Sequence, residues 1–203
     1  MPRSPSRNRP PGSADPAAGA TAADTGAVLL AVARAVLVEE LLGSAPRTDE
    51  SHAWLHEQGA TFVTLTTRGR LNGCIGTVEP RRTLLADVRG NAYAAAFRDR
   101  RFPRLTAGEL DHTVIEVSVL SDATPMPVTS EADALARLRP HVDGVVLECG
   151  RRRATFLPRV WEHLPEPADF LSRLRLKAGL PALYWSDDVR LSRYTVTEHR
   201  EGG

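Results

Sequence analysis

The sequence has few of the residues that mark a disulfide-linked, metal-binding or nucleic-acid-binding protein. Only two of its 203 residues are cysteines, Cys74 and Cys149, which excludes a disulfide scaffold and indicates a reducing compartment. Lysine occurs once, at Lys177, and aromatic residues make up 5% of the chain, so platforms for stacking bases are scarce. The 26 basic and 25 acidic residues nearly cancel, so no overall field attracts nucleic acid or an anionic membrane.

A long hydrophobic run is also missing. The longest apolar stretch, residues 27–38, is interrupted by Arg34 and falls short of the about 20 residues that span a bilayer. Residues 1–19 contain arginines but no apolar segment typical of a secretory signal. We therefore expect a cytoplasmic protein. Arginine outnumbers lysine along the whole chain, which we attribute to a GC-rich genome rather than to RNA binding.

Composition predicts a tail followed by one domain. Residues 1–20 are rich in proline, alanine and arginine, and their small apolar surface does not offset the entropy of ordering, so we expect a disordered tail. The hydrophobic content of the chain, 42%, can supply a core of ordinary size. We place that core in a single domain over residues 21–200.

Hydrophobic periodicity predicts helices and hairpins in mixed order. Apolar residues at helical spacing indicate helices over about residues 25–42, 84–97, 131–138 and 167–177, and a short turn at 52–56. Alternating segments indicate strands at residues 61–66, 71–78, 114–120, 144–148, 154–157 and 189–197. Hairpins between helices, without regular βαβ alternation, predict an α+β fold with a mainly antiparallel sheet and flanking helices.

The last predicted strand changes phase along its length. Its apolar residues fall at Val189 and Leu191, but then at Tyr194 and Val196. A phase change within one strand is typical of a β-bulge, which we place near residues 192–193.

Six segments of the sequence occur in an order that is characteristic of one family. They are Phe62-Val63-Thr64-Leu65, Leu71-Asn72-Gly73-Cys74-Ile75-Gly76, the run from Ala95 to Phe102, the run from Ile115 to Ser121, the run from Ala154 to Trp161, and Leu176-Lys177-Ala178-Gly179-Leu180. Over residues 27–198 they resemble the AMMECR family, which in bacteria and archaea is protein A of the AmmeMemoRadiSam system. The resemblance implies an α+β fold with a larger and a smaller subdomain, and a cleft between them lined by the loop at residues 72–76.

The resemblance also implies partners. Genes of this family commonly accompany a Memo-like protein, which resembles extradiol dioxygenases, and a radical-SAM protein. A shared modification pathway follows as an expectation, although the family's biochemical activity is not established. Two cysteines cannot form the three-cysteine cluster motif of a radical-SAM enzyme, so that chemistry would belong to another chain.

Three positions depart from the family's usual pattern. Asn72 stands where the signature has arginine, which removes any anion contact made by that side chain. Arg100 stands where proline is usual. Arg175 stands where many members have a second cysteine, and this weakens a dithiol mechanism that would pair it with Cys74.

The segment at residues 72–76 holds the main candidate site residues. Cys74 is a candidate catalytic nucleophile if a positive neighbour favours its thiolate, and the alternative is a small packing residue in a strand. Gly73 and Gly76 would bare the backbone so that a ligand could approach closely, and a tight sheet bulge explains them equally well. With Asn72 and Ile75 they form the predicted substrate-binding set.

Candidates elsewhere are weaker. Lys177 could act as a Schiff-base or general-base lysine, but a cation near a helix C-terminus is commonly structural. His52 and His56 have the spacing of a metal pair without the glutamate of a His-Glu-x-x-His motif, so we predict no metal site, and no cofactor is indicated.

Two hypotheses for function follow from these residues. The first is a component of a modification pathway that transfers a group, with a cleft around residues 72–76 that binds a small molecule or a modified side chain. The second is a non-catalytic adaptor that uses the same cleft to dock a peptide or the Memo-like and radical-SAM partners. RNA binding ranks last.

Overall fold

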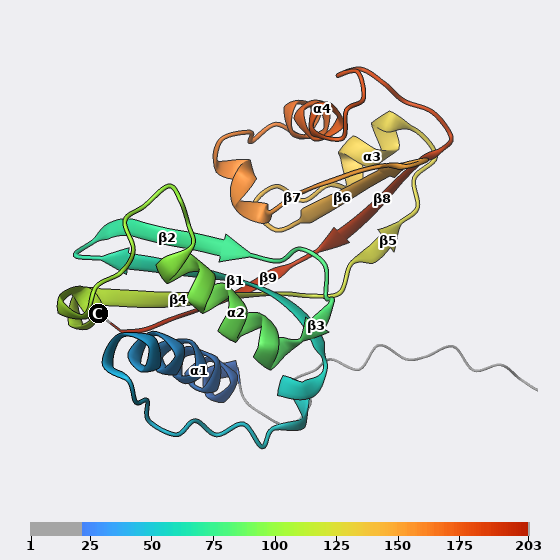
Figure 1. Cartoon of the computed structure of the whole chain (residues 1–203). Coiled ribbons are helices and arrows are strands. Elements are labelled where there is room, and N and C mark those ends of the chain that lie inside the picture. The colour runs from blue at the N-terminus through green and yellow to red at the C-terminus, as the bar shows by residue number, and fades with distance from the viewer. Residues whose placement is uncertain (1–21, 203) are drawn as a thin grey trace, which may run out of the picture.

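A computed structural model describes residues 22–202 of the chain as two lobes, each built from an antiparallel sheet and helices (Figure 1). The predicted tail at residues 1–20 lies outside the described residues. The predicted α+β class with antiparallel sheets is confirmed. Each lobe has its own cluster of buried apolar side chains, and a third, smaller cluster lies between them.

The first lobe contains a five-stranded sheet in the order β2-β1-β4-β9, with β3 paired to β1. Its strands are β1 (Gln58–Thr67), β2 (Arg70–Gly76), β3 (Arg82–Thr83), β4 (Thr113–Leu120) and β9 (Val196–Arg200). Its helices are α1 (Ala22–Leu42), α2 (Leu84–Phe97) and the short 3-10 helices η1 (Ala53–His56) and η2 (Ala107–His112). Figure 1 shows α1 and α2 on the same side of this sheet, which leaves the opposite side to the second lobe.

The second lobe contains a four-stranded sheet in the order β5-β8-β6-β7. Its strands are β5 (Thr124–Met126), β6 (Gly144–Cys149), β7 (Arg152–Phe156) and β8 (Val189–Tyr194). Its helices are α3 (Glu131–Arg137), the 3-10 helix η3 (Pro158–Glu162) and α4 (Pro167–Lys177). The stacked rings of Trp161 and Phe170, 3.7 Å apart, join η3 to α4 at the centre of this lobe's core.

Local sequence signals explain where several elements begin and end. Gly43 has a positive φ of 80° directly after α1, as expected of a helix C-terminal cap. The Thr83 side chain accepts a hydrogen bond from the N–H of Ala86 and caps α2. Arg68 and Gly69, with φ angles of 50° and 76°, form the tight turn between β1 and β2.

The predicted strand at residues 189–197 is wrong in one respect, because the chain forms two strands there. β8 ends at Tyr194 and pairs with β5 and β6, whereas β9 begins at Val196 and pairs with β4 of the other sheet. No bulge lies near residues 192–193, because β8 pairs with β6 in unbroken register from Val189 to Tyr194. The phase changes because the two faces of β8 meet different clusters: Val189 and Leu191 pack in the core of the second lobe, whereas Tyr194 points to the opposite face and joins Val196 of β9 in the cluster between the lobes.

The lobes are joined by two chain crossings and by apolar contacts. Ser121 and Thr195 lie side by side where the chain passes between the lobes, with the N–H of Ser121 donating to the Thr195 carbonyl and the N–H of Thr195 donating to the Ser121 hydroxyl. The apolar cluster between the lobes contains Ala60, Leu120, Val146 and Tyr194, and the surrounding Phe62, Val78, Leu157 and Val196 pack against it. An ion pair between Glu79 and Arg153 adds a polar contact across the junction.

Candidate functional site

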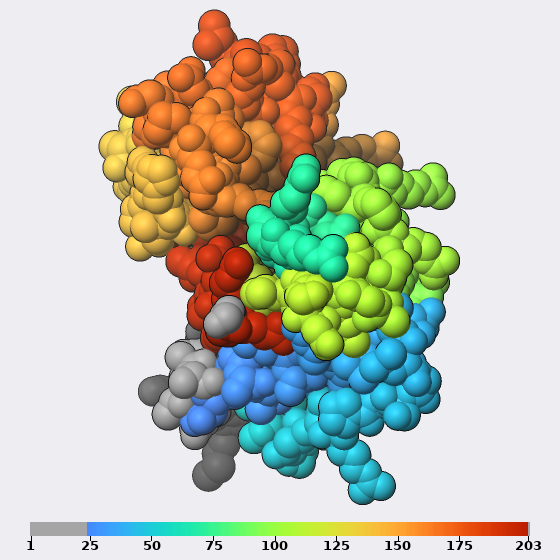
Figure 2. All heavy atoms as spheres, turned by 90° about the vertical axis from the view of Figure 1, so that its left-hand side faces the viewer, coloured from blue at the N-terminus to red at the C-terminus, as the bar shows by residue number. Residues whose placement is uncertain are grey.

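Cys74 lies on the face of the first sheet that is turned away from the helices. Its neighbours Gly73 and Ile75 face α2, because a β carbon on Gly73 would meet the Ala95 carbonyl and Ile75 packs on the core beneath that helix. Alternation along a strand then turns Cys74 to the opposite face, beside its cross-strand partner Thr64. Figure 2 shows the β1–β2 hairpin, in turquoise, directly beneath the second lobe.

The sulfur of Cys74 is held between the two lobes. The Thr64 hydroxyl donates to Sγ over 3.4 Å from the adjacent strand. From the second lobe, Nη1 and Nη2 of Arg159 both lie 3.7 Å from Sγ. The residue is 8% exposed, so these two groups cover most of the thiol. A hydroxyl from one lobe and a guanidinium from the other therefore both lie at the sulfur.

An ion pair closes the free edge of β2 at Cys74. The Asp99 carboxylate accepts the Cys74 N–H over 3.0 Å, and Nη2 of Arg101 donates to the Cys74 carbonyl over 2.7 Å. Asp99 and Arg101 are themselves joined over 2.7 Å, so the pair occupies both backbone groups that a neighbouring strand would use. This clamp fixes the backbone of the residue that carries the thiol.

The Asp99 carboxylate gives the clamp a pH dependence. Hydrogen bonds from the Arg101 side chain, with further ones from the N–H groups of Cys74 and Arg101, outweigh burial and lower the pKa of Asp99 well below its ordinary value near 3.8. A carboxylate with a lowered folded-state pKa adds stability above its unfolded pKa and loses that contribution as pH falls. We therefore expect the thermal midpoint of the wild type to decrease as the pH is lowered from about 5 to about 2. Asp99→Asn should start lower and show a shallower fall over this range, and equal slopes would contradict the assignment.

A cavity of about 250 Å³ lies next to this thiol, between the lobes. The first lobe lines it with Phe62, Thr64, Glu116, Ser118, Val196 and Glu198. The second lobe lines it with Leu157, Pro158, Arg159 and Glu162. Thr64 and Arg159 contact both the cavity and Cys74 Sγ, so a bound molecule would lie one side chain away from the sulfur.

A larger depression of about 490 Å³ lies elsewhere, and it is shallow and open. It is lined by Arg34, Asp111, His112, Thr113, Val114, Glu201 and Gly202. The ion pair between Arg34 and Glu201 occupies part of its wall and ties α1 to the end of the chain beyond β9. Thr64 and Arg159, which contact the Cys74 sulfur, line the interlobe cavity and not this depression, so we place the candidate site in the interlobe cavity.

The two glycines beside Cys74 are required by packing. A β carbon on Gly73 would lie 2.2 Å from the carbonyl oxygen of Ala95 in α2, and one on Gly76 would lie 2.2 Å from the Phe62 ring. The open backbone face expected at Gly73 is therefore absent, because α2 fills it. A ligand contact at Gly73 or Gly76 stays a prediction, but neither glycine is evidence for one.

Asn72 and Ile75 also have roles within the fold. The register between β1 and β2 shifts between Leu65 and Thr66, and Asn72 is the residue left unpaired, so a bulge directly precedes Gly73. The Asn72 side chain donates to the Thr67 hydroxyl over 3.2 Å, which holds the bulge. Ile75 packs on the first core, on the face away from the cleft.

The remaining candidates lie apart from the thiol. Lys177 is exposed at the end of α4, where its ammonium donates to the Thr155 carbonyl over 2.9 Å and lies 5.1 Å from the centre of the Phe156 ring. Cys149 is half-buried in the second lobe, with its sulfur 3.9 Å from the Tyr184 hydroxyl. These contacts give both residues structural roles.

The other residues singled out in the sequence are also accounted for by local contacts. Arg175, at a position where many relatives have cysteine, is buried in the second lobe, where it pairs with Glu131 and donates to the Ala182 carbonyl over 2.6 Å. His52 stacks on Trp54, and the His56 ring is hydrogen-bonded to the Glu50 carbonyl. Within residues 22–202, no group of three or more His, Cys, Asp and Glu side chains is arranged to hold a metal ion.

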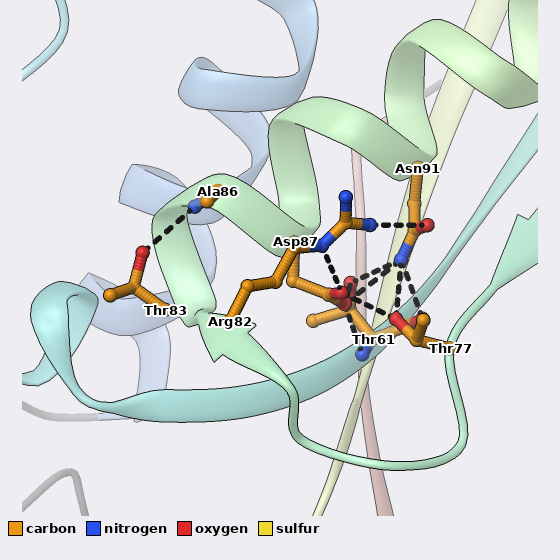
Figure 3. A network of polar contacts seen from close by, with 7 residues as sticks. All are labelled: Thr61, Thr77, Arg82, Thr83, Ala86, Asp87 and Asn91. Atoms are coloured by element: carbon orange, nitrogen blue, oxygen red, sulfur yellow. Dashed lines mark hydrogen bonds and ion pairs between the residues drawn. The ribbon is translucent and has the colours of Figure 1, made fainter.

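A buried network on α2 positions the chain segment that follows β2 (Figure 3). The fully buried Asp87 carboxylate accepts hydrogen bonds from the Thr61 N–H, from the Thr61 and Thr77 hydroxyls, from Arg82 Nε and from the Asn91 amide. Asn91 also donates to the Thr61 carbonyl and accepts from Arg82. Nothing in the sequence marks these residues as a cluster, because their spacing matches no binding motif.

Arg159 is the site residue that sequence reasoning missed. It lies in one of the segments that resemble the family, yet nothing in the sequence connects residue 159 with residue 74. Glu116 lines the cavity from the face of β4 opposite the buried Ile115 and Val117.

The two lobes and their junction define an α+β protein with a cysteine beside the interlobe cleft. The chain belongs to the AMMECR1 family, whose sequence profile matches residues 30–199. A protein of Methanothermobacter thermautotrophicus is 35% identical over 184 residues, covering 89% of this chain and 96% of that protein. A protein of Thermotoga maritima is 40% identical over 145 residues, covering 70% and 78% of the two chains.

A similar fold is found among solved structures. The crystal structure of an uncharacterised protein from Pyrococcus horikoshii superposes with a TM-score of 0.68 at 26% sequence identity, covering 85% of this chain and 89% of that one. In the part of the chain that the structure describes, no helix is both long and apolar enough to cross a membrane.

Proposed function

We propose that this protein is a component of a modification pathway whose interlobe cleft binds a small molecule or a modified side chain, with Cys74 as its covalent acceptor. The observation that carries the proposal is the guanidinium of Arg159, which reaches Cys74 Sγ from the opposite lobe. A fold that needed Cys74 only as a packing residue would not require a cation at its sulfur. The adjoining cavity leaves room for a reacting molecule.

The covalent step is a nucleophilic substitution at the sulfur. The Cys74 thiolate attacks an electrophilic carbon of the bound molecule, the new S–C bond forms, and the leaving group departs with the electron pair of the bond that breaks. Arg159 and Thr64 stabilise the thiolate before the attack, while Asp99 and Arg101 hold the backbone of Cys74 in place. Transfer of the group to a second acceptor restores the thiolate.

The Memo-like and radical-SAM proteins are the proposed partners in this pathway. Their involvement follows from the resemblance of the chain to protein A of the AmmeMemoRadiSam system. Any radical chemistry would take place on the radical-SAM protein, and this chain would bind or carry a group before or after that step.

A non-catalytic adaptor is the second candidate, and one observation favours it. Cys74 is 8% exposed beneath Arg159 and Thr64, so a reactant reaches the sulfur only if one of these side chains moves. In an adaptor the same cleft would accept a side chain of a docked peptide or partner, and the thiol would remain unreacted.

RNA binding is the weakest of the three classes. Three arginines near the end of α2 lie over aromatic rings: Arg98 over Tyr93, Arg101 over Phe102 and Arg104 over Phe97. An arginine already lies over one face of each ring, which reduces the aromatic surface on which bases could stack.

The nucleophile proposal predicts that Cys74 is alkylated faster than Cys149, although Cys149 is the more exposed of the two. At high pH the alkylation rate of Cys74 reaches a limit that reports only how accessible the sulfur is. Arg159→Gln should lower the alkylation rate at pH 7 relative to this limit, because the cation no longer favours the thiolate. Arg159→Lys should restore part of this ratio. The measurement is mass spectrometry of iodoacetamide-treated protein, with Cys149 as the internal control.

A strain that lacks the gene distinguishes the two candidate functions. If the protein transfers a group, a deletion strain that expresses Cys74→Ser should not regain the wild-type metabolite profile, although the variant should still bind its partners. If the protein is an adaptor, the strain that expresses Cys74→Ser should regain the wild-type profile fully. Equal alkylation of the two cysteines, combined with a functional Cys74→Ser strain, would overturn the nucleophile proposal.

A further inference from the structure

The interlobe cavity carries an excess of negative charge contributed by both lobes. Glu116 and Glu198 enter it from β4 and β9, and Glu162 enters it from η3. Glu116 is paired with Arg200 over 3.3 Å. Within residues 22–202, the Glu162 and Glu198 side chains have no ion-pair or hydrogen-bond partner, and the one cation in the lining, Arg159, lies at the sulfur. Both side chains are exposed, and a cation that entered the cavity between them would be attracted by both carboxylates.

A hydroxyl that is open to the same cavity also lacks a partner among the described residues. Ser118 is 9% exposed and lines the cavity from β4, and its side chain forms no hydrogen bond with any described residue. Its hydroxyl oxygen is accessible from the cavity and can therefore form a hydrogen bond with a polar group of a bound molecule.

Apart from Thr64, the remaining walls of the cavity are apolar. Phe62 and Val196 line the first-lobe side, and Leu157 and Pro158 line the second-lobe side. Phe62, Leu157 and Val196 also pack against the apolar cluster between the lobes. Such walls favour methylene groups, whose burial contributes about 0.8 kcal/mol each.

We propose that the cleft binds a primary ammonium group carried on a short aliphatic stem. The ammonium would lie between Glu162 and Glu198 and donate a hydrogen bond to Ser118, while the stem would pack on the apolar walls. A small alkylamine and the side chain of a lysine in a peptide share this chemistry. The inference rests on the proposed role of the cleft as the binding site and names the class of molecule that it accepts.

The test compares probes of equal length and different charge on the full-length protein. Isothermal titration should show that n-pentylamine binds at least about tenfold more tightly than n-pentanol, and that pentanoate does not bind. Nα-acetyl-lysine methylamide and n-pentylamine separate the two sources, since a site for a peptide side chain should prefer the former. Equal affinity for the amine and the alcohol would overturn the proposal.

Variants of the cavity carboxylates test whether n-pentylamine binds in this cavity. Glu162→Gln and Glu198→Gln should each weaken n-pentylamine binding about fivefold, because each removes one partly exposed ion pair. The double variant should weaken it about 25-fold if the two carboxylates act independently. Glu40→Gln, which removes an exposed carboxylate of α1, is the matched control and should leave the affinity unchanged. A loss in the control as large as in the cleft variants would contradict the assignment.

Repeating the titration on Cys74→Ser separates this inference from the proposed covalent step. Unchanged amine binding in that variant, together with an unreactive Cys74 in the wild type, would support the proposed ligand and contradict the proposed role of Cys74 as a nucleophile. A reactive Cys74 in a protein that does not bind n-pentylamine would support the nucleophile and contradict the proposed ligand.

Discussion

Replacing Asp87 with alanine should lower the free energy of unfolding by about 4 kcal/mol, because it leaves several buried donors without their acceptor. The Thr61 N–H lies 2.8 Å from the carboxylate and the Asn91 amide lies 2.9 Å from it, and neither has water to replace the lost oxygen at this depth. For a chain of this size the thermal midpoint should fall by about 10 °C.

The position of Asp87 in the network gives this prediction further consequences. Its contact with Thr77 holds the segment that leaves β2, and two residues later Glu79 pairs with Arg153 of the second lobe. Asp87→Ala should therefore loosen the lobe junction, and limited proteolysis should cut the segment after β2 sooner than in the wild type.

Two variants test the explanation. Asp87→Asn keeps the shape of the side chain and one acceptor oxygen, so its free energy of unfolding should lie between those of the wild type and Asp87→Ala. Asp188→Ala, at an exposed aspartate, should change the stability by less than about 0.5 kcal/mol. Chemical denaturation followed by circular dichroism gives the free energies, and equal losses at positions 87 and 188 would contradict the role of the network.

Replacing Gly73 with alanine should cost about 3 kcal/mol and lower the thermal midpoint by about 10 °C. The added methyl carbon would lie 2.2 Å from the Ala95 carbonyl oxygen and 2.9 Å from the carbonyl carbon, both of which belong to the backbone of α2. A helix backbone cannot yield as a flexible side chain does, so β2 and α2 must separate. The separation would also strain the adjoining clamp on Cys74 by Asp99 and Arg101.

The matched control is Gly108→Ala in η2. A β carbon at Gly108 meets no atom within 4 Å, so this substitution adds the same methyl group without a clash. Its stability should remain within about 0.5 kcal/mol of the wild type. Gly76→Ala should fall between the two, since the Phe62 ring that it meets is a side chain that can turn. A phenotype of Gly73→Ala thus reports lost packing and cannot by itself indicate a ligand.

Most elements of the fold could be predicted from the sequence because their signals are local. The cap at Gly43, the turn at residues 68–69 and the proline that starts α4 act within a few residues of where they stand. Hydrophobic periodicity located the helices for the same reason, since each buries one face. Leu176 is an exception, because the helical pattern included it in the apolar stripe of α4 and yet its side chain is exposed.

The site was predicted only in part. The sequence indicated Cys74 and its neighbours through an unusual pattern of glycines and a family resemblance. The physical cause of the glycines is different from the expected one, since α2 and the Phe62 ring occupy the space above them. No local pattern distinguishes a glycine required by a packed helix from one required by a ligand.

The sequence by itself determined the fold class, the order of the α-helices and of most strands, and the position of Cys74 on a hairpin strand, because spacing along the chain decides these. The tertiary structure alone decided that residues 189–200 divide between two sheets, that Arg159 meets Cys74 across 85 residues of chain, and that Glu162 and Glu198 face one cavity. These contacts depend on how the lobes pack together. Packing sums the burial of many side chains from distant segments, and no single stretch of sequence carries that information.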